Sequence, residues 1–334
     1  MKIRLLTLAL CLAPMAARAG DGAAVAFPLL SDREAWSHLP KAERGQDQPL
    51  PGWARALARG LPRTTAAMLE LDWLHRARNP IGPVLRGEMR WVAADANRCA
   101  YSKAAAEADL RHAGVDVRGI AALRAGPERW PAEDRAALIF ARQMTVNAAA
   151  VTDAQVASLR ESYGEEKLVA MVLLLAYSNF QDRLLLSLGL PPEEGGPKPP
   201  LDCRFPREKV APEVPARARP EERHGPEAPT TVDDPEWAGV GFETLQANLD
   251  TQRGNGGRIR VPTFEEYMKK LPADAPRPKA PVKIKWSLVC MVYQPALAAG
   301  WSACTTAFRE EAKQDRVFEE SLFWIVTRTI DCFY

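Results

Sequence analysis

The chain has 334 residues, and its 44 basic and 42 acidic side chains give a formal net charge of +2. This near balance excludes a protein that holds nucleic acid or an anionic surface mainly through its net charge. At roughly 100–200 residues per domain, the length allows two domains, each large enough for its own hydrophobic core.

The first nineteen residues have the pattern of a secretory signal peptide. Basic Lys2 and Arg4 precede an apolar run, and the Ala-Arg-Ala at 17–19 offers a small-x-small cleavage site. The apolar run is well below the ~20 residues that a membrane-spanning helix needs. We therefore expect cleavage after about Ala19, export to the periplasm or the cell exterior, and no membrane anchor.

Residues 50–190 predict helices, and strand patterns are absent. Amphipathic stretches at 53–61, 66–78 and 84–97 are followed by an alanine-rich one at 102–114. Proline and acids at 131–134 indicate another helix start, and Thr152 with Gln155 forms a predicted capping box. The segment 168–188 contains the most apolar stretch after the signal peptide, and the thirteen residues 168–180 before Gln-Asp-Arg are too few to span a bilayer, so it predicts a buried central helix.

Twelve prolines lie between residues 191 and 235, with charged residues and few large apolar side chains among them. Such a stretch predicts an extended linker between two domains, at 26–190 and 236–334. After the linker, Thr263 and Glu266 form a second predicted capping box at the start of a helix over 264–271. Further helices are predicted at 286–293, 297–309 and 316–329.

A short pattern occurs twice at a constant separation, which indicates an internal repeat. In each copy a mostly apolar helical stretch ends in Cys-x-Tyr. The second copy stops in the middle of the pattern, so we interpret the chain as a truncated reading frame or fragment. With no gap, residues of the second copy follow their equivalents by 233 positions: Arg76 and Arg309, Trp91 and Trp324, Cys99 and Cys332, Tyr101 and Tyr334.

Four segments together carry a family resemblance: Asn-Arg-Cys-Ala-Tyr at 97–101, Pro-Ala-Glu-Asp-Arg-Ala-Ala-Leu at 131–138, Val-Thr-Asp at 151–153, and Asn-Phe-x-x-Arg-Leu at 179–184. On these, the region from about residue 57 to 190 resembles the carboxymuconolactone decarboxylase / alkylhydroperoxidase-D-like family of all-helical proteins. The last ~50 residues look like the front half of a second copy. The resemblance implies an all-α protein, with an incomplete second helical domain after the linker.

The family's peroxidase-type members share a motif for thiol chemistry. It consists of a Glu, eleven further residues, Cys-x-x-Cys, and a His four residues after the second Cys. A thiol attacks a peroxide only as a thiolate, so the His and Glu must lower its pKa and relay its proton. The other Cys then closes a disulfide, which a reductant reopens.

Transferred to this chain by position, the motif is incomplete in both copies. The first copy keeps Cys99, but has Ser102 at the second cysteine, Ala106 at the histidine and Gly87 at the glutamate. In the second copy, Glu320 and Cys332 match, and the chain stops one residue before the second cysteine.

Two neighbouring residues in the first copy could replace the missing groups, but their helical positions are unsuitable. Glu88 is rotated by ~100° from position 87, and His112 lies ~9 Å along the helix from position 106. The candidate catalytic residues are therefore Cys332, Glu320 and Cys99. For Cys99, the alternative is a thiol packed in the core.

Three functions remain open: an exported thiol-dependent peroxidase with antioxidant, peroxiredoxin-type activity, an acid–base enzyme of the decarboxylase kind, and a non-catalytic helical assembly module. Expected partners are a dithiol reductant and further copies in a homo-oligomer.

No cofactor or metal is predicted, because the four histidines are scattered and no Cys-x-x-Cys-His is present. Five cysteines follow the signal peptide, and a Cys290–Cys304 disulfide is left open.

Overall fold

The computed structural model describes residues 27–206, 241–254, 257–271, 277–278, 280–282, 284–312 and 314–329. Across these ranges the secondary structure is helical, with a single isolated bridge between Arg44 and Arg204 and no strand. The predicted all-α fold class is confirmed. The predicted signal peptide at residues 1–19 and Cys332 lie outside the described residues.

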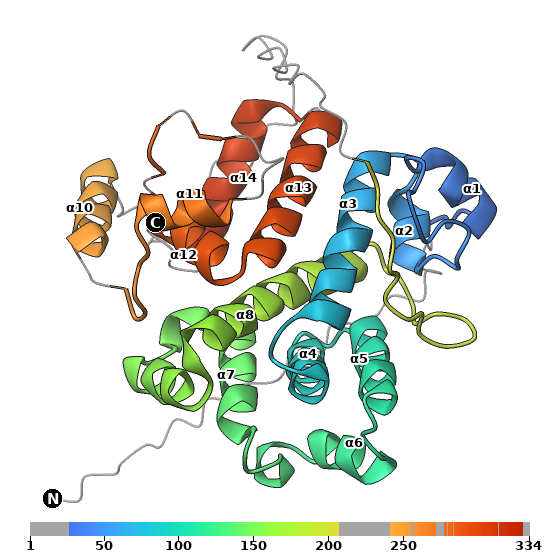
Figure 1. The fold of residues 1–334 in the computed structure, drawn as a ribbon, viewed down its shortest axis with the longest axis horizontal. Helices are drawn as coiled ribbons and strands as arrows, with labels where there is room; N and C mark the ends of the chain where they lie inside the picture. The colour runs from blue at the N-terminus through green and yellow to red at the C-terminus, as the bar shows by residue number, and fades with distance from the viewer. Residues whose placement is uncertain are drawn as a thin grey trace, which may run out of the picture.

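The part of the chain before residue 190 forms a bundle of helices (Figure 1). Its elements are α1 (Asp32–His38), α2 (Gly52–Leu57), α3 (Pro62–Trp73), the π-helical turn η1 (Leu74–Arg78), α4 (Pro83–Ala96), α5 (Ala100–His112), α6 (Val117–Arg124), the 3-10 turn η2 (Pro127–Arg129), α7 (Arg135–Val146), the 3-10 turn η3 (Ala148–Ala150) and α8 (Asp153–Ser187).

The C-terminal part adds five more described helices, which are α10 (Phe242–Gly254), α11 (Phe264–Lys270), α12 (Lys285–Tyr293), α13 (Pro295–Ala312) and α14 (Arg316–Thr329). Both predicted capping boxes are present, at Thr152 with Gln155 and at Thr263 with Glu266. In each, the hydroxyl accepts from the backbone of the third helical residue, whose own side chain returns to the cap.

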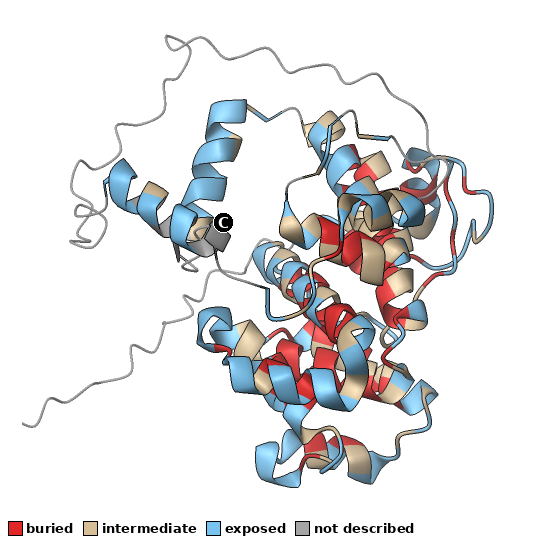
Figure 2. Ribbon diagram, turned by 60° about the vertical axis from the view of Figure 1, so that its left-hand side comes forward, coloured by how far each residue is buried: buried red, intermediate tan, exposed pale blue. Residues whose placement is uncertain are grey.

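Helix α4 lies in the middle of the bundle and packs against α5, α7 and α8. Met89 and Ala93 on α4 are completely buried, in a core that also contains Leu138 of α7 and Met171 of α8. Figure 2 shows the buried positions concentrated in these helices. A helix covered on several sides needs small or apolar residues around most of its circumference, as α4 has.

Helix α8 is the long apolar helix that the sequence predicts over 168–188, with an additional N-terminal part. Gly164 adopts φ 79°, which breaks the helical path between the two parts. By length and composition α8 is apolar enough to cross a membrane, but 61% of that apolar window is buried inside the fold. A core helix of a water-soluble protein passes the same test, so this finding is weak evidence for a membrane span.

Residues 191–206, which we call the strap, differ from the predicted extended linker. Leu201, Cys203 and Phe205 are buried, and the Phe205 N–H donates to Glu70 Oε1 of α3 at 2.6 Å. The burial of these three side chains holds the proline-rich segment against the bundle. The entropic cost of ordering it is low, because proline residues have few backbone conformations to lose on folding. The rest of the predicted linker, residues 207–235, lies outside the described residues.

The C-terminal helices pack directly on the first bundle. Helix α13 runs along α3, and α12 contacts α8. Cys304 of α13 belongs to the same buried cluster as Trp53 and Leu69. At the α3 N-terminus, the Thr64 backbone N–H and hydroxyl both donate to Glu311 at 2.7 Å.

The α3–α13 contact depends on Gly300. A Cβ built at Gly300 would lie 2.9 Å from Leu74 Cδ1 and 3.2 Å from Leu71 Cδ1. We expect Gly300→Val to destabilise the protein by about 1–3 kcal/mol, because it overfills this contact. Urea unfolding measures the change, with Ser302→Val on the exposed side of the same helix as the control. Equal effects of the two substitutions would contradict this packing.

Candidate functional site

The four motif positions of the first copy lie along the contact between α4 and α5. Arg98 adopts φ 58°, and this left-handed residue closes the tight turn between the two helices. Cys99 then forms the N-cap of α5, with its Sγ 3.5 Å from Ser102 Oγ. Gly87 on α4 faces α5, since a Cβ there would lie 3.8 Å from the Ala106 carbonyl oxygen. Cys99 and Ser102 thus lie at the turn, and Gly87 and Ala106 lie further along the contact between the two helices.

The chemical groups of the motif are absent from this arrangement. A Cβ at Gly87 would be only 2.7 Å from Leu110 Cδ2, so a leucine occupies the room that a glutamate would need. Ala106 is completely buried and has no titratable group. Neither a base nor a proton relay is present at the positions where the motif supplies them.

Cys99 is 1% exposed. Burial raises the pKa of its thiol above the usual 9.0, hydrogen bonding with Ser102 opposes the shift, and the Asp182 carboxylate raises the pKa further. A peroxide-reactive cysteine requires the opposite shift, toward a thiolate at neutral pH. The structure therefore gives Cys99 the properties of a packed thiol.

Glu88 and His112, the two neighbouring residues considered as replacements, lie in different surroundings from Cys99. Glu88 is buried and its electrostatic neighbours are Asp134 and Glu133, which precede α7. His112 lies in the last turn of α5 and is exposed.

Glu320 is found on an exposed face of α14, where its nearest ionic partner is Arg316 at 3.8 Å. The structure therefore does not bring Glu320 to the buried surroundings of Cys99. Cys332 falls outside the described residues.

Cys290 and Cys304 are both free thiols, so the disulfide left open by the sequence is not formed. Burial raises their pKa values to about 11 and about 12.

Beside the motif lies a buried ion cluster that the sequence did not predict. The π-helical turn η1 directs Arg76 into the bundle, where its guanidinium bonds Asp109 of α5 at 2.8 and 2.9 Å and Asp72 of α3 at 3.1 Å. Burial by itself lowers the pKa of Arg76, but Asp72 and Asp109 outweigh it, so the net shift is upward. The sequence feature that could have indicated this cluster is the spacing of four residues between Asp72 and Arg76 in a mostly apolar helix, because residues four apart lie on the same helix face.

The same cluster includes residues from α8. Tyr177 donates its hydroxyl to Asp72 Oδ1 at 2.8 Å, and Gln181 donates to the same oxygen at 3.1 Å. The Tyr177 ring stacks on His75 with centroids 4.6 Å apart. Burial, with the nearby charge of Arg90, lowers the pKa of His75 to about 3 and keeps the imidazole neutral.

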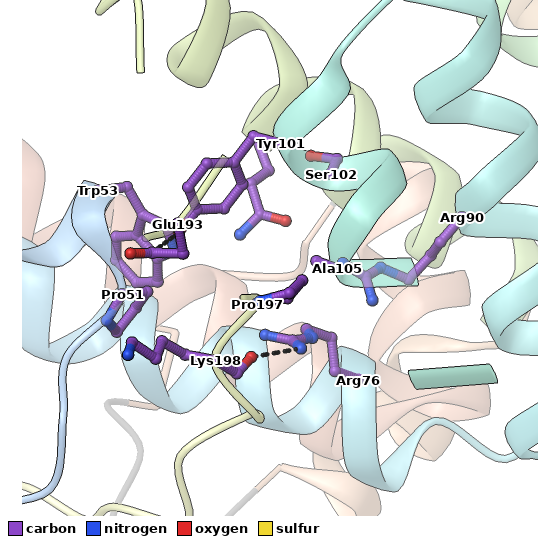
Figure 3. A pocket seen from close by; sticks show the side chains of 11 residues that line it. Pro51, Trp53, Arg76, Arg90, Tyr101, Ser102, Ala105, Glu193, Pro197 and Lys198 are labelled. Atoms are coloured by element: carbon purple, nitrogen blue, oxygen red, sulfur yellow. Dashed lines mark hydrogen bonds between the residues drawn. The ribbon is translucent and has the colours of Figure 1, made fainter. Parts of the chain in front are cut away.

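A small pocket, with room for about one water molecule, lies between this cluster and the motif and is covered by the strap (Figure 3). Glu193 of the strap accepts from the Tyr101 hydroxyl and from the Gly52 backbone N–H, the latter at 2.5 Å. The Lys198 carbonyl accepts from Arg76 at 3.0 Å. The pocket is lined by Pro51, Trp53, Arg76, Arg90, Tyr101, Ser102, Ala105, Gln181, Glu193, Pro197 and Lys198.

The strap thus closes the space next to Ser102, where the motif would have its second cysteine.

No group of three or more metal-binding side chains occurs in the described part of the chain.

No protein-family model matches the chain, and no curated protein sequence matches it significantly. The likeness to the carboxymuconolactone decarboxylase / alkylhydroperoxidase-D-like family therefore remains a prediction from the motif residues. The fold agrees with it only at the level of an all-α bundle.

The Tyr101–Glu193 hydrogen bond fixes the strap over the pocket. Tyr101→Phe removes the donor to a buried carboxylate, and we expect a loss of about 1–3 kcal/mol in stability. Hydrogen exchange of residues 191–206 should become faster in this variant. As a control, Tyr163→Phe removes a hydroxyl bonded to Asp134, away from the strap. Unchanged strap exchange in Tyr101→Phe would contradict this role.

Glu88 should give the protein a characteristic pH dependence. Burial, helped by Asp134 and Glu133, raises the pKa of Glu88 from the usual 4.5 to about 7. The folded state therefore binds this proton more tightly, and the resulting stability is present below pH 4.5 and lost as the pH rises through about 7. The loss should be about 2 kcal/mol.

Urea unfolding at pH 5 and pH 8 measures this effect, with Glu88→Gln as the comparison. The variant should lack that part of the pH dependence, because its side chain stays uncharged. An identical pH dependence in both proteins would show that Glu88 is not the titrating group.

Proposed function

We propose that the chain is an exported, non-catalytic helical assembly module, which keeps the scaffold of a carboxymuconolactone decarboxylase / alkylhydroperoxidase-D-like protein without its thiol chemistry. The observation that carries this proposal is the site in the first copy. Gly87 and Ala106 stand at the motif positions of the acid and the base, and Cys99 is a buried thiol with a raised pKa. Export rests on the signal-peptide pattern of residues 1–19.

Helix boundaries support the proposed tandem repeat. Helices α12, α13 and α14 begin at Lys285, Pro295 and Arg316. Each of these residues follows the first residue of α2, α3 and α4, respectively, by 233 positions, the same separation as in the sequence pattern. Three helix starts in one constant register are expected when a helical unit is duplicated.

The contact between the copies supports assembly as the role of the repeat. Helices α3 and α13 are equivalent in the repeat, and they pack against each other. Leu71 of α3 and Leu74 of η1 face Gly300 of α13, whose own equivalent is Ala67 of α3. When equivalent helices of two copies contact each other, the interface resembles that of a two-fold symmetric dimer. A single chain thus contains the kind of helix contact that two subunits of a symmetric dimer would form.

The competing candidate is a thiol peroxidase that acts through the second copy. The spacing of Glu320 and Cys332 matches the motif, so this candidate would use Cys332 as the reactive thiol and a dithiol as reductant. In the first copy, the alanine at position 106 also removes the base that a decarboxylase-type reaction would need.

A peroxide turnover assay decides between these functions. The mature protein is incubated with a small organic hydroperoxide and a dithiol reductant, alongside Cys99→Ser, Cys332→Ser and a cysteine-free variant. We expect consumption no faster than that of the cysteine-free protein. Catalytic turnover that one serine substitution abolishes would overturn the proposal and identify the reactive thiol.

A further inference from the structure

The strap lies on the bundle in the way that an extended peptide lies in a binding groove. Along residues 201–205 every second side chain is buried, and the two residues between them are exposed. The buried ones are Leu201, Cys203 and Phe205. Main-chain atoms pair at the same place, because the Glu43 N–H donates to the Arg204 carbonyl at 2.7 Å. Main-chain pairing with alternate side chains in pockets is a common mode of peptide recognition.

Polar contacts hold the first half of the strap. The Glu193 side chain is 5% exposed, and its carboxylate accepts from the Tyr101 hydroxyl and the Gly52 N–H. The Lys198 carbonyl accepts from Arg76 at 3.0 Å. The groove under the strap therefore supplies hydrogen-bond donors, and the strap supplies the acceptors, among them a carboxylate.

The bundle positions these donors through its own contacts. Arg76 is bonded by Asp72 of α3 and by Asp109 of α5. Tyr101 lies in the first turn of α5, a helix that packs along α4. Donors held by such helices are already oriented for a ligand, which lowers the cost of binding.

The strap leaves donors of this groove unused. Arg90 has a side chain that is 4% exposed and lines the pocket beside Glu193 (Figure 3). Its Nε is buried without a hydrogen-bond partner among the described residues, and so is the Nε of Arg55, whose guanidinium lies 3.8 Å from the Glu193 carboxylate. A buried donor without an acceptor is unfavourable. The groove therefore suits a ligand that carries more acceptor atoms than the strap does.

We infer that the groove under the strap is a binding site for an extended, acidic, proline-containing peptide of a partner protein, and that the strap occupies this site in cis. This inference rests on the proposed assembly function, and it names a surface and the kind of partner. An acidic side chain of the partner takes the place of Glu193, and apolar side chains at alternate positions take those of Leu201 and Phe205. Because the strap belongs to the same chain, it competes at a high effective concentration, and the partner must displace it.

The test uses the strap sequence itself as the partner peptide. A fluorescein-labelled peptide of residues 191–206 is titrated into the full chain under reducing conditions, and fluorescence anisotropy measures binding. The native chain is compared with Glu193→Gln/Phe205→Ala, which weakens the strap in cis. We expect the double variant to bind the peptide at least about tenfold more tightly than the native chain does. Circular dichroism checks that its helices remain, and Glu193→Gln alone replaces it should they not.

Matched changes in the peptide and the protein make the test specific. A peptide with Glu193→Gln should bind at least about tenfold more weakly than the acidic peptide, because it lacks the carboxylate. Adding Tyr101→Phe to the protein should reduce this difference, whereas Tyr163→Phe, which removes a hydroxyl bonded to Asp134, should leave it unchanged. The inference is overturned if the weakened chain does not bind the acidic peptide, if the two peptides bind alike, or if both tyrosine variants behave alike.

Recognition of a free carboxylate alone would also overturn the inference. Sodium glutamate should fail to displace the labelled peptide at concentrations at which the unlabelled peptide displaces it. Equal displacement would mean that the groove does not read an extended chain. Peroxide turnover of the native chain is measured separately, so failure of the peptide site and failure of the proposed function are distinguishable.

Discussion

The buried guanidinium of Arg76 is the interaction on which the rest of the structure depends. It joins Asp72 of α3, Asp109 of α5 and the Lys198 carbonyl of the strap, so three separate segments meet at one charge. Breaking such a buried pair typically costs about 3–5 kcal/mol, because a charge remains without its partner. The orientation of α5, and with it the position of Cys99, follows from this cluster. The strap is held over the pocket by the same group.

The candidate site of the first copy consists of packed side chains. Gly87 and Ala106 carry no titratable group, and Cys99 is buried with its Sγ near Ser102 Oγ. Leu110 occupies the space next to Gly87, and the strap covers the pocket beside Ser102. An arrangement of this kind supports contacts between helices, which is the basis of the assembly function that we propose.

Local signals in the sequence predicted the fold well where they determine structure. Helical periodicity and the capping boxes at Thr152 and Thr263 predicted where helices form, because periodicity and capping each depend on residues within one or two turns of one another. The packing of the strap and the shared core of α3 and α13 were missed, since they depend on partners more than a hundred residues away. For the site, the motif singled out Cys99, which the structure places in the core with a raised pKa. It could not reveal the Arg76 cluster, which the π-helical turn η1 assembles from four separate segments.

A first copy without thiol chemistry requires Cys99 to be a protonated, inaccessible thiol in the native protein. Its pKa can be measured directly by following iodoacetamide alkylation against pH, with mass spectrometry resolving Cys99 from the other cysteines. We predict slow alkylation throughout, and a titration above the ordinary thiol value, because burial raises the pKa and Asp182 adds to it. Rapid alkylation with a midpoint below pH 7 would mean that the native protein stabilises a thiolate at Cys99, and the account would be wrong.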